Sequence, residues 1–177
     1  QDQVRLLAID HPADVDIFSN EKVGPPSVSE FYVHTAQDPR LPVAARNHVG
    51  HDLLPRISAE DDDYAQPHTR WHTQGYTHDS FLELHLGELH DPGRIVLFLT
   101  GWLQPTDAAI NTSLQENPDL PGPQPPSIQV PSASGEWIEA VPYMGFPGGK
   151  TKTIAVDISD IFPTSDYRLR IATSMEL

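Results

Sequence analysis

The sequence predicts an all-β fold, a two-sheet antiparallel β-sandwich with long ordered loops. Residues Phe81 to Leu86 alternate leucines with other side chains, which is the pattern of a strand with one buried face. Similar short segments recur along the chain between turns rich in Pro, Gly and Asp. The chain also contains 18 prolines, which remove backbone donors and break helix interiors, so a mainly helical fold is disfavoured.

The stretch from Ser80 to Trp102 predicts two strands joined as a hairpin. Its turn is Asp91 to Gly93, where Asp caps a turn, Pro fixes φ and Gly accepts a positive φ. The following run, Ile95 to Leu99, is apolar on both faces. Such a run is typical of a strand that is central in its sheet.

The other predicted strands are short segments with an apolar or alternating pattern. Together with the hairpin strands they are Val4–Ile9, Val15–Phe18, Glu30–Thr35, Pro42–Asn47, Phe81–Leu86, Ile95–Thr100, Ala109–Ser113, Ser127–Val130, Trp137–Val141, Thr153–Ile158 and Tyr167–Thr173. The best helical candidate is a turn or two near Asp107 to Asn117, although this segment also fits a strand followed by a loop. The region from His48 to Asp79 is polar, rich in His and acidic residues, and predicts a long loop of the kind that is either functional or disordered.

Composition limits the class of protein. A length of 177 residues fits one domain, 1–177, and the start at Gln1 suggests a fragment or a module of a larger protein. The formal charge of −14 disfavours nucleic acid and anionic lipid as partners, and no apolar run is long enough to insert into a membrane. The chain has no cysteine, which excludes disulfides, thiolate metal sites and a cysteine nucleophile.

Three segments carry a family resemblance: LELHLGELHDPGRIVLFLTGW, SIQVPSASGEWIEAV and DYRLRIATS. In this order they resemble the galactose-binding-like (discoidin-like) jelly rolls. The segments LLAIDHPADVDIFSNEKVGPP, LTGWLQPTDAAIN and MGFPGGKTKTIAVDISDIFP are similar to the non-repeat module of secreted bacterial proteins that carry FG-GAP, ASPIC/UnbV or tetratricopeptide repeats. The resemblance implies a jelly roll and a secreted or periplasmic bacterial protein, and it supplies no catalytic residues.

Two groups of residues are candidate metal ligands. Asp61, Asp62 and Asp63 form the densest charge run, and carboxylate oxygens suit Ca²⁺, although charge runs are usually solvated and a solvated acidic loop is the favoured explanation. His68 and His72 are four residues apart, a spacing that aims two imidazoles at one metal on a helix. The neighbouring Pro, Thr and Gly residues argue against a helix there, so hydrogen-bonded surface histidines are the alternative.

Aromatic residues indicate a possible carbohydrate platform. Trp71 and Tyr76 lie in the predicted His-rich loop and Trp102 follows an apolar strand. Flat rings with a polar edge stack on sugars, and Arg70, Asp107 and Asn111 would supply hydrogen bonds. The alternative is that large aromatic side chains such as Trp102 and Trp137 fill the ends of the core.

The glycine-rich segment Met144 to Lys150 lacks the spacing of a phosphate-binding P-loop, contains a proline, and precedes a predicted strand. It is interpreted as a structural turn.

The favoured function is a non-catalytic, exported binding module that holds a glycan, with a Ca²⁺ site, or packs against neighbouring protein domains. One alternative is a metal-dependent enzyme on a cupin-like barrel, with ligands from His68, His72, Glu83 and His85, or a polysaccharide lyase. The other is a structural spacer domain in a multidomain repeat protein.

Overall fold

The computed structural model describes residues 6, 8–24, 33–59, 61–66, 75–90, 93–104, 106–117, 119 and 122–176, with the backbone alone for Asp79 and Gln115. The strands in this part of the chain are β1 (Val15–Ser19), β2 (Lys22–Val23), β3 (Val33–Gln37), β4 (Ala44–Asn47), β5 (Tyr76–His85), β6 (Val96–Gly101), β7 (Ser127–Pro131), β8 (Trp137–Val141), β9 (Phe146–Pro147), β10 (Lys152–Asp157) and β11 (Arg168–Met175). The helices are α1 (Leu54–Ile57) and α2 (Ala108–Glu116). The all-β prediction is therefore confirmed.

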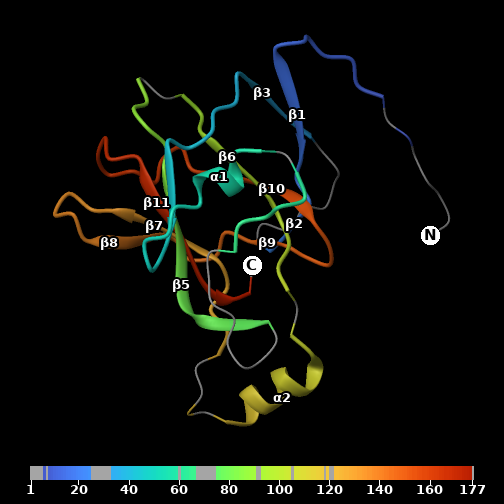
Figure 1. The fold of residues 1–177 in the computed structure, drawn as a ribbon, viewed down its shortest axis with the longest axis vertical. Coiled ribbons are helices and arrows are strands. Elements are labelled where there is room, and N and C mark those ends of the chain that lie inside the picture. Colours follow the sequence, from blue (N-terminus) through green and yellow to red (C-terminus); the bar gives the residue numbers. More distant parts are fainter. Residues whose placement is uncertain are drawn as a thin grey trace.

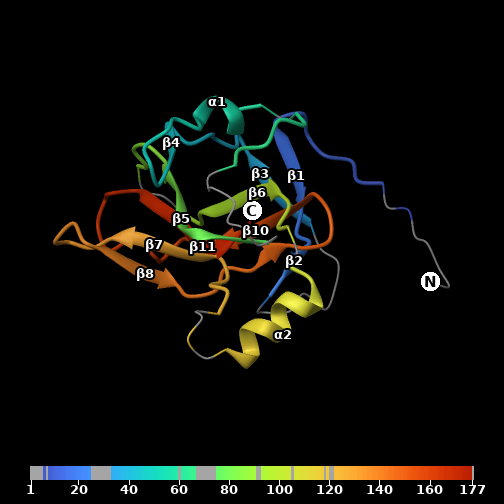
Figure 2. The same cartoon turned by 60° about the horizontal axis from the view of Figure 1, so that its bottom comes forward.

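The strands form one large antiparallel sheet and three smaller pairs. The large sheet has five strands in the order β4-β5-β11-β7-β8, and the pairs are β1-β3, β10-β6 and β2-β9. The apolar core lies between the large sheet and the β10-β6 pair, because buried Leu84, Ile128 and Leu169 from the one pack with Ile154 and Val156 from the other. Figure 1 shows this arrangement, with α2 apart from the sheets, and Figure 2 gives the same arrangement turned by 60°.

The hairpin predicted for Ser80 to Trp102 is wrong, although both of its strands exist. β5 pairs with β4 and β11, whereas β6 pairs with β10. The connection between them is long enough to cross from one layer to the other. At its start the Leu86 N–H donates to the Tyr167 carbonyl, and at its end the Ile95 N–H donates to Ser159 Oγ. Each end is thus bound within its own layer.

The prediction that β6 is central in its sheet is also wrong. Among the described residues β6 has β10 as its single strand neighbour. Its residues are apolar on both sides because both faces are covered. Leu97 and Leu99 pack against the core, whereas the Phe98 ring stacks on Phe18 of β1 with centroids 4.1 Å apart.

Three other predicted segments differ from the structure in whole or in part. Ala109–Ser113 is not a strand but part of α2, as the helical alternative expected. The segment predicted as a loop from His48 to Asp79 contains α1 and the start of β5. Of the predicted first strand, Leu6, Ala8 and Ile9 are described without strand structure, and the remainder lies outside the described residues.

The glycine-rich turn is structural, as its spacing indicated. Gly145 has φ +81°, and a Cβ atom there would lie 2.4 Å from Lys22 Cγ and 2.9 Å from the Val23 carbonyl oxygen. The adjacent β9 pairs with β2. A glycine is therefore required for the two strands to approach.

We expect Gly145→Ala to lower the free energy of unfolding by about 2–4 kcal/mol, because both the positive φ and the collision oppose a side chain. The matched control is Gly135→Ala, at φ +85° with open space around it, which should cost about 1 kcal/mol. Urea unfolding followed by tryptophan fluorescence measures both. Equal losses in the two variants would contradict the close approach of β2 and β9.

Asp157, at the end of β10, provides a pH-dependent contribution to stability. Its carboxylate accepts hydrogen bonds from Ser159 Oγ at 2.6 Å and from Arg94 Nε at 2.9 Å. These bonds, that of Ser159 first, lower the pKa of Asp157 to about 2 from 3.8. Because the pKa is lower in the folded state, the stabilisation is complete above pH 3.8 and disappears as the pH falls through about 2.

Asp157→Asn should therefore destabilise the protein at pH 7 by about 0.5–1 kcal/mol, a small value because half of the side chain is exposed to solvent. The difference between wild type and variant should shrink between pH 4 and pH 2. Thermal unfolding by circular dichroism across this range tests it. A difference that stays constant would show that the carboxylate charge does not stabilise the fold.

Candidate functional site

The outer face of the five-stranded sheet, opposite the core, carries a polar row across all five strands. The register pairs Arg46 with Glu83, Glu83 with Arg170, Arg170 with Gln129 and Gln129 with Glu139. We call these five residues the outer row. They share one face because side chains alternate along a strand, and each has at least one sequence neighbour in the core or packed against it. The row is therefore fixed by the same alternation that forms the core.

Arg170 is the centre of this face. Its Nε and Nη2 atoms both lie 2.8 Å from Glu83 Oε2. The guanidinium carbon also lies 3.9 Å from the ring centroids of Phe81 and Trp137. The side chains of Arg170 and Glu83 are only 23% and 13% exposed, so water screens these contacts weakly. The guanidinium is held as a flat plate between two rings.

Arg168 extends the face toward the start of β11. Its guanidinium binds both carboxylate oxygens of Asp166 and lies 5.7 Å from the centroid of the Trp137 ring. The hydrogen bond from Arg168 lowers the pKa of Asp166, and the same bond raises the pKa of Arg168. Both groups are thus charged at neutral pH, and Trp137 lies beside two arginines.

This combination of groups can bind a polar, uncharged molecule. The half-buried rings of Phe81 and Trp137 offer flat surfaces beside the arginines, while Glu83, Gln129 and Glu139 offer hydrogen-bond acceptors. Arginines and carboxylates on the face are balanced in number, unlike the whole chain with its charge of −14. The hydroxyl groups of a sugar both donate and accept hydrogen bonds, so they suit such a surface.

The sequence did not identify this site. The alternation of Phe81 to Leu86 predicts that Phe81 and Glu83 lie opposite the buried leucines, but it says nothing of Trp137, for which the sequence suggests only a place at the end of the core. Nothing local in the sequence pairs β8 with β7 and β7 with β11, and this pairing brings Trp137 to Arg170.

The aromatic residues predicted from sequence have different environments. Trp102 is 43% exposed, so it does not fill the core. Tyr76 is 5% exposed and lies at the start of β5 rather than in a loop. Burial raises the pKa of Tyr76, and its ring offers no exposed face for a sugar. Arg70 and Trp71 lie outside the described residues.

The predicted hydrogen-bonding partners Asp107 and Asn111 are used within their own segment. Asp107 Oδ1 accepts the Ile110 N–H at 2.8 Å and so caps the N-terminus of α2. Asn111 Oδ1 accepts the Thr106 hydroxyl at 2.7 Å. These two side chains serve the local structure of the helix.

The predicted metal ligands are only partly described. Asp61 Oδ1 accepts the Asp63 N–H at 2.8 Å, and the Asp63 carboxylate contacts Arg56. Asp62 is exposed. His68 and His72 lie outside the described residues. In the portion of the chain that the structure describes, no three His, Asp or Glu side chains are grouped as a metal site.

The cupin-like arrangement is not formed by its two described members. Glu83 and His85 lie on the outer face of β5, opposite core residue Leu84, and Glu83 is paired with Arg170. They therefore do not point into an interior between strands.

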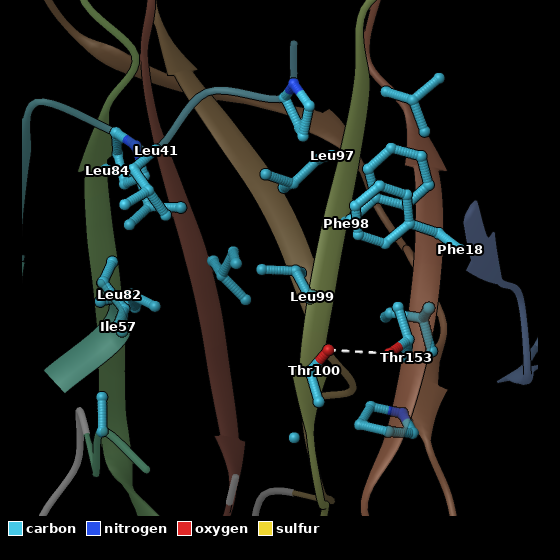
Figure 3. Close-up of a pocket in the computed structure, with 18 of the residues that line it drawn as sticks. Phe18, Leu41, Ile57, Leu82, Leu84, Leu97, Phe98, Leu99, Thr100 and Thr153 are labelled. Atoms are coloured by element: carbon cyan, nitrogen blue, oxygen red, sulfur yellow. Dashed lines mark hydrogen bonds between the residues drawn. The ribbon is translucent and has the colours of Figure 1, made fainter. Parts of the chain in front are cut away.

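A second candidate is a hollow of about 2150 Å³ between the layers. Figure 3 shows Leu82 and Leu84 of β5 on one side and Leu97 and Leu99 of β6 on the other, with Ile57 of α1 beside Leu82. The leucines of β5 and β6 continue the core to an open side, and polar and charged side chains, Asp61 to Asp63 among them, also border the hollow.

Comparison with protein-family models, curated proteins and solved structures finds no match to this chain. The search for membrane-spanning helices found none among the described residues.

The energetic coupling on the outer face can be measured directly. Arg170→Ala should destabilise the protein by about 2 kcal/mol, because it leaves the largely buried Glu83 carboxylate without its main partner. The double variant with Glu83→Ala should lose less than the sum of the single losses, by about 1 kcal/mol or more. Urea unfolding provides all four free energies.

The control is Arg46→Ala, because Arg46 is 59% exposed and lies 4.0 Å from Glu83. It should change stability by no more than about 0.5 kcal/mol. Additive losses for Glu83 and Arg170 would contradict the coupling.

Proposed function

We propose that this chain is a non-catalytic binding module that holds a glycan on the outer face of its five-stranded sheet. The observation that carries the proposal is the Arg170 guanidinium held between Phe81 and Trp137, next to Glu83 and Arg168. It combines flat surfaces with fixed donors and acceptors. These are the groups with which proteins bind the CH face and the hydroxyls of a sugar ring.

The charge of this face supports a glycan over an anion. Arg46, Arg168 and Arg170 are balanced by Glu83, Glu139 and Asp166. A phosphate or sulfate group would compete with carboxylates already bound to the arginines, and the charge of −14 repels it at longer range. A neutral polyol meets neither obstacle.

We infer a galactose-binding-like jelly roll, in line with the resemblance of the segments that contain β5, β6, β7, β8 and β11. The antiparallel five-stranded sheet packed over the β10-β6 pair supports it. Export from a bacterial cell follows from the same resemblance and is checked by fractionation of the native host.

A glycan array probed with the purified protein, with calcium and with EGTA, tests the proposal. Trp137→Phe and Arg168→Ala should each weaken binding of the glycans that the wild type retains by about tenfold or more, because they remove ring area or a guanidinium from the face. A calcium requirement that is lost in Asp62→Asn would support a Ca²⁺ site at Asp61 to Asp63.

The matched control is Trp102→Phe, which makes the same change at an exposed ring away from the outer row. It should bind as the wild type does. Loss in Trp102→Phe with retention in Trp137→Phe would move the site to Trp102. Absence of any wild-type binding under both conditions would overturn the glycan proposal in favour of a structural spacer.

A further inference from the structure

One edge of β6 presents its backbone groups away from β10. The Ile158 N–H donates to the Ile95 carbonyl at 3.0 Å, and the Ile95 N–H donates to Ser159 Oγ at 3.0 Å. Ile95 therefore directs both backbone groups to the β10 side. Because these directions alternate along a strand, the residue directly after Ile95, and every second residue from there on, directs its backbone N–H and C=O groups to the opposite edge. These residues are Val96, Phe98 and Thr100.

The hydrogen bonds of β10 give an independent check of which β6 residues direct their backbone groups away from it. The residues of β10 opposite Thr100 and Phe98 are Thr153 and Ala155. The Thr153 carbonyl accepts the Glu21 N–H at 3.0 Å, and the Ala155 N–H donates to Asn20 Oδ1 at 3.1 Å. Both bonds leave β10 on the side away from β6. Thr100 and Phe98 are thus in non-hydrogen-bonded pairs, as the 2.7 Å contact between the Thr100 and Thr153 hydroxyls also indicates.

This edge belongs to a strand that borders the hollow between the layers. Residues from both faces of β6 line the hollow, Leu97 and Leu99 from one face and Phe98 from the other. Within the described part of the chain, no strand pairs with this edge. Figure 3 shows the leucines of β5 and β6 facing one another on one side of β6, and the stacked rings of Phe18 and Phe98 on the other.

We propose that the free edge of β6 is a strand-addition site that takes an extended segment of a partner protein. Such a segment would pair with the N–H and C=O groups of Val96, Phe98 and Thr100. Its side chains would alternate between the leucine-lined interior and the Phe98 side. The backbone bonds supply affinity, and the apolar interior selects for apolar residues at every second position.

The charge of the hollow specifies the flanks of the segment. Carboxylates outnumber guanidinium groups among the residues that border it, including Asp61, Asp62 and Asp63. The whole chain carries −14. Basic residues on either side of the apolar positions would therefore be attracted. The partner is a protein with an extended, alternating apolar segment between lysines or arginines.

The geometry favours a single extended segment over a second folded copy. The edge is recessed between Leu82 and Leu84 on one side and the β1-β3 pair on the other. A second copy would have to bring its own recessed β6 into contact. A single strand needs only about 5 Å of width beside β6.

Amide hydrogen exchange tests the site in the full chain. The probe is a synthetic peptide in which valine and threonine alternate between terminal lysines. The amides of Val96, Phe98 and Thr100 should exchange fast in the free protein and become protected with the peptide, while Leu97 and Leu99 are protected throughout. Protection of all three in the free monomer, or no added protection with the peptide, would overturn the proposal.

Removal of a backbone N–H from the free edge is a second test of the site. Val96→Pro removes one N–H on the free edge and no bond to β10, and should weaken peptide binding about tenfold, whereas Val96→Ala should retain it. If the proline variant does not fold, a peptide N-methylated at alternate positions replaces it. Equal binding of the blocked and unblocked forms would refute backbone pairing.

Two further comparisons identify the occupant. A peptide with terminal glutamates should bind more weakly than the lysine form, and equal affinity would refute the charge argument. Protection of the edge amides that depends on protein concentration, together with a dimer in light scattering, would replace the peptide by a second copy. Glycan binding should be unchanged in Val96→Ala and Val96→Pro, so the failure of one proposal leaves the other intact.

Discussion

The alternation of side chains along β11 is the constraint on which the rest of the structure depends. Leu169 and Ile171 point into the core, while Arg168 and Arg170 point to the outer face. Since β11 lies in the middle of the five-stranded sheet, its register fixes both surfaces at once. A slip of one residue would place the arginines in the core and the aliphatic residues in water. The core and the candidate site are therefore specified by the same strand.

The layer formed by β10 and β6 is held in place by other contacts. β10 contributes Ile154 and Val156 to the core, Ile158 follows directly after it, and the outer edge of β10 is bound by the segment after β1 through Asn20. Ala155 lies opposite Phe98 in the register. Its small side chain leaves room for the Phe18 and Phe98 rings to stack on the face of this layer that is away from the core. Within the described residues, this layer is covered on both faces but not along the free edge of β6. An apolar strand with an unpaired edge requires a cover or a partner to avoid uncontrolled association.

The positions of most strands could be predicted from the sequence, but little of the pairing between strands could. Alternation is a local property, so it located β5, β7, β8 and β11 within a few residues. Pairing is not local, and adjacency in sequence led to a hairpin of β5 with β6 that the structure does not contain. The apolar run of β6 was interpreted as a central strand, because coverage of both faces gives the same pattern whether or not both edges are paired. For α2, the Asp107 cap outweighs the weak strand pattern of Ala109 to Ser113.

The two proposed surfaces would bind their ligands through different interactions, so they can act independently. On the outer face the groups are charged, balanced and held in place before any ligand arrives, which limits the entropy lost on binding. Along the edge of β6 the groups are backbone amides and apolar side chains, and the ligand itself must become ordered. The excess of negative charge lies outside the balanced outer face and includes the border of the hollow. Salt should therefore affect a basic partner at the edge far more than a neutral glycan on the sheet.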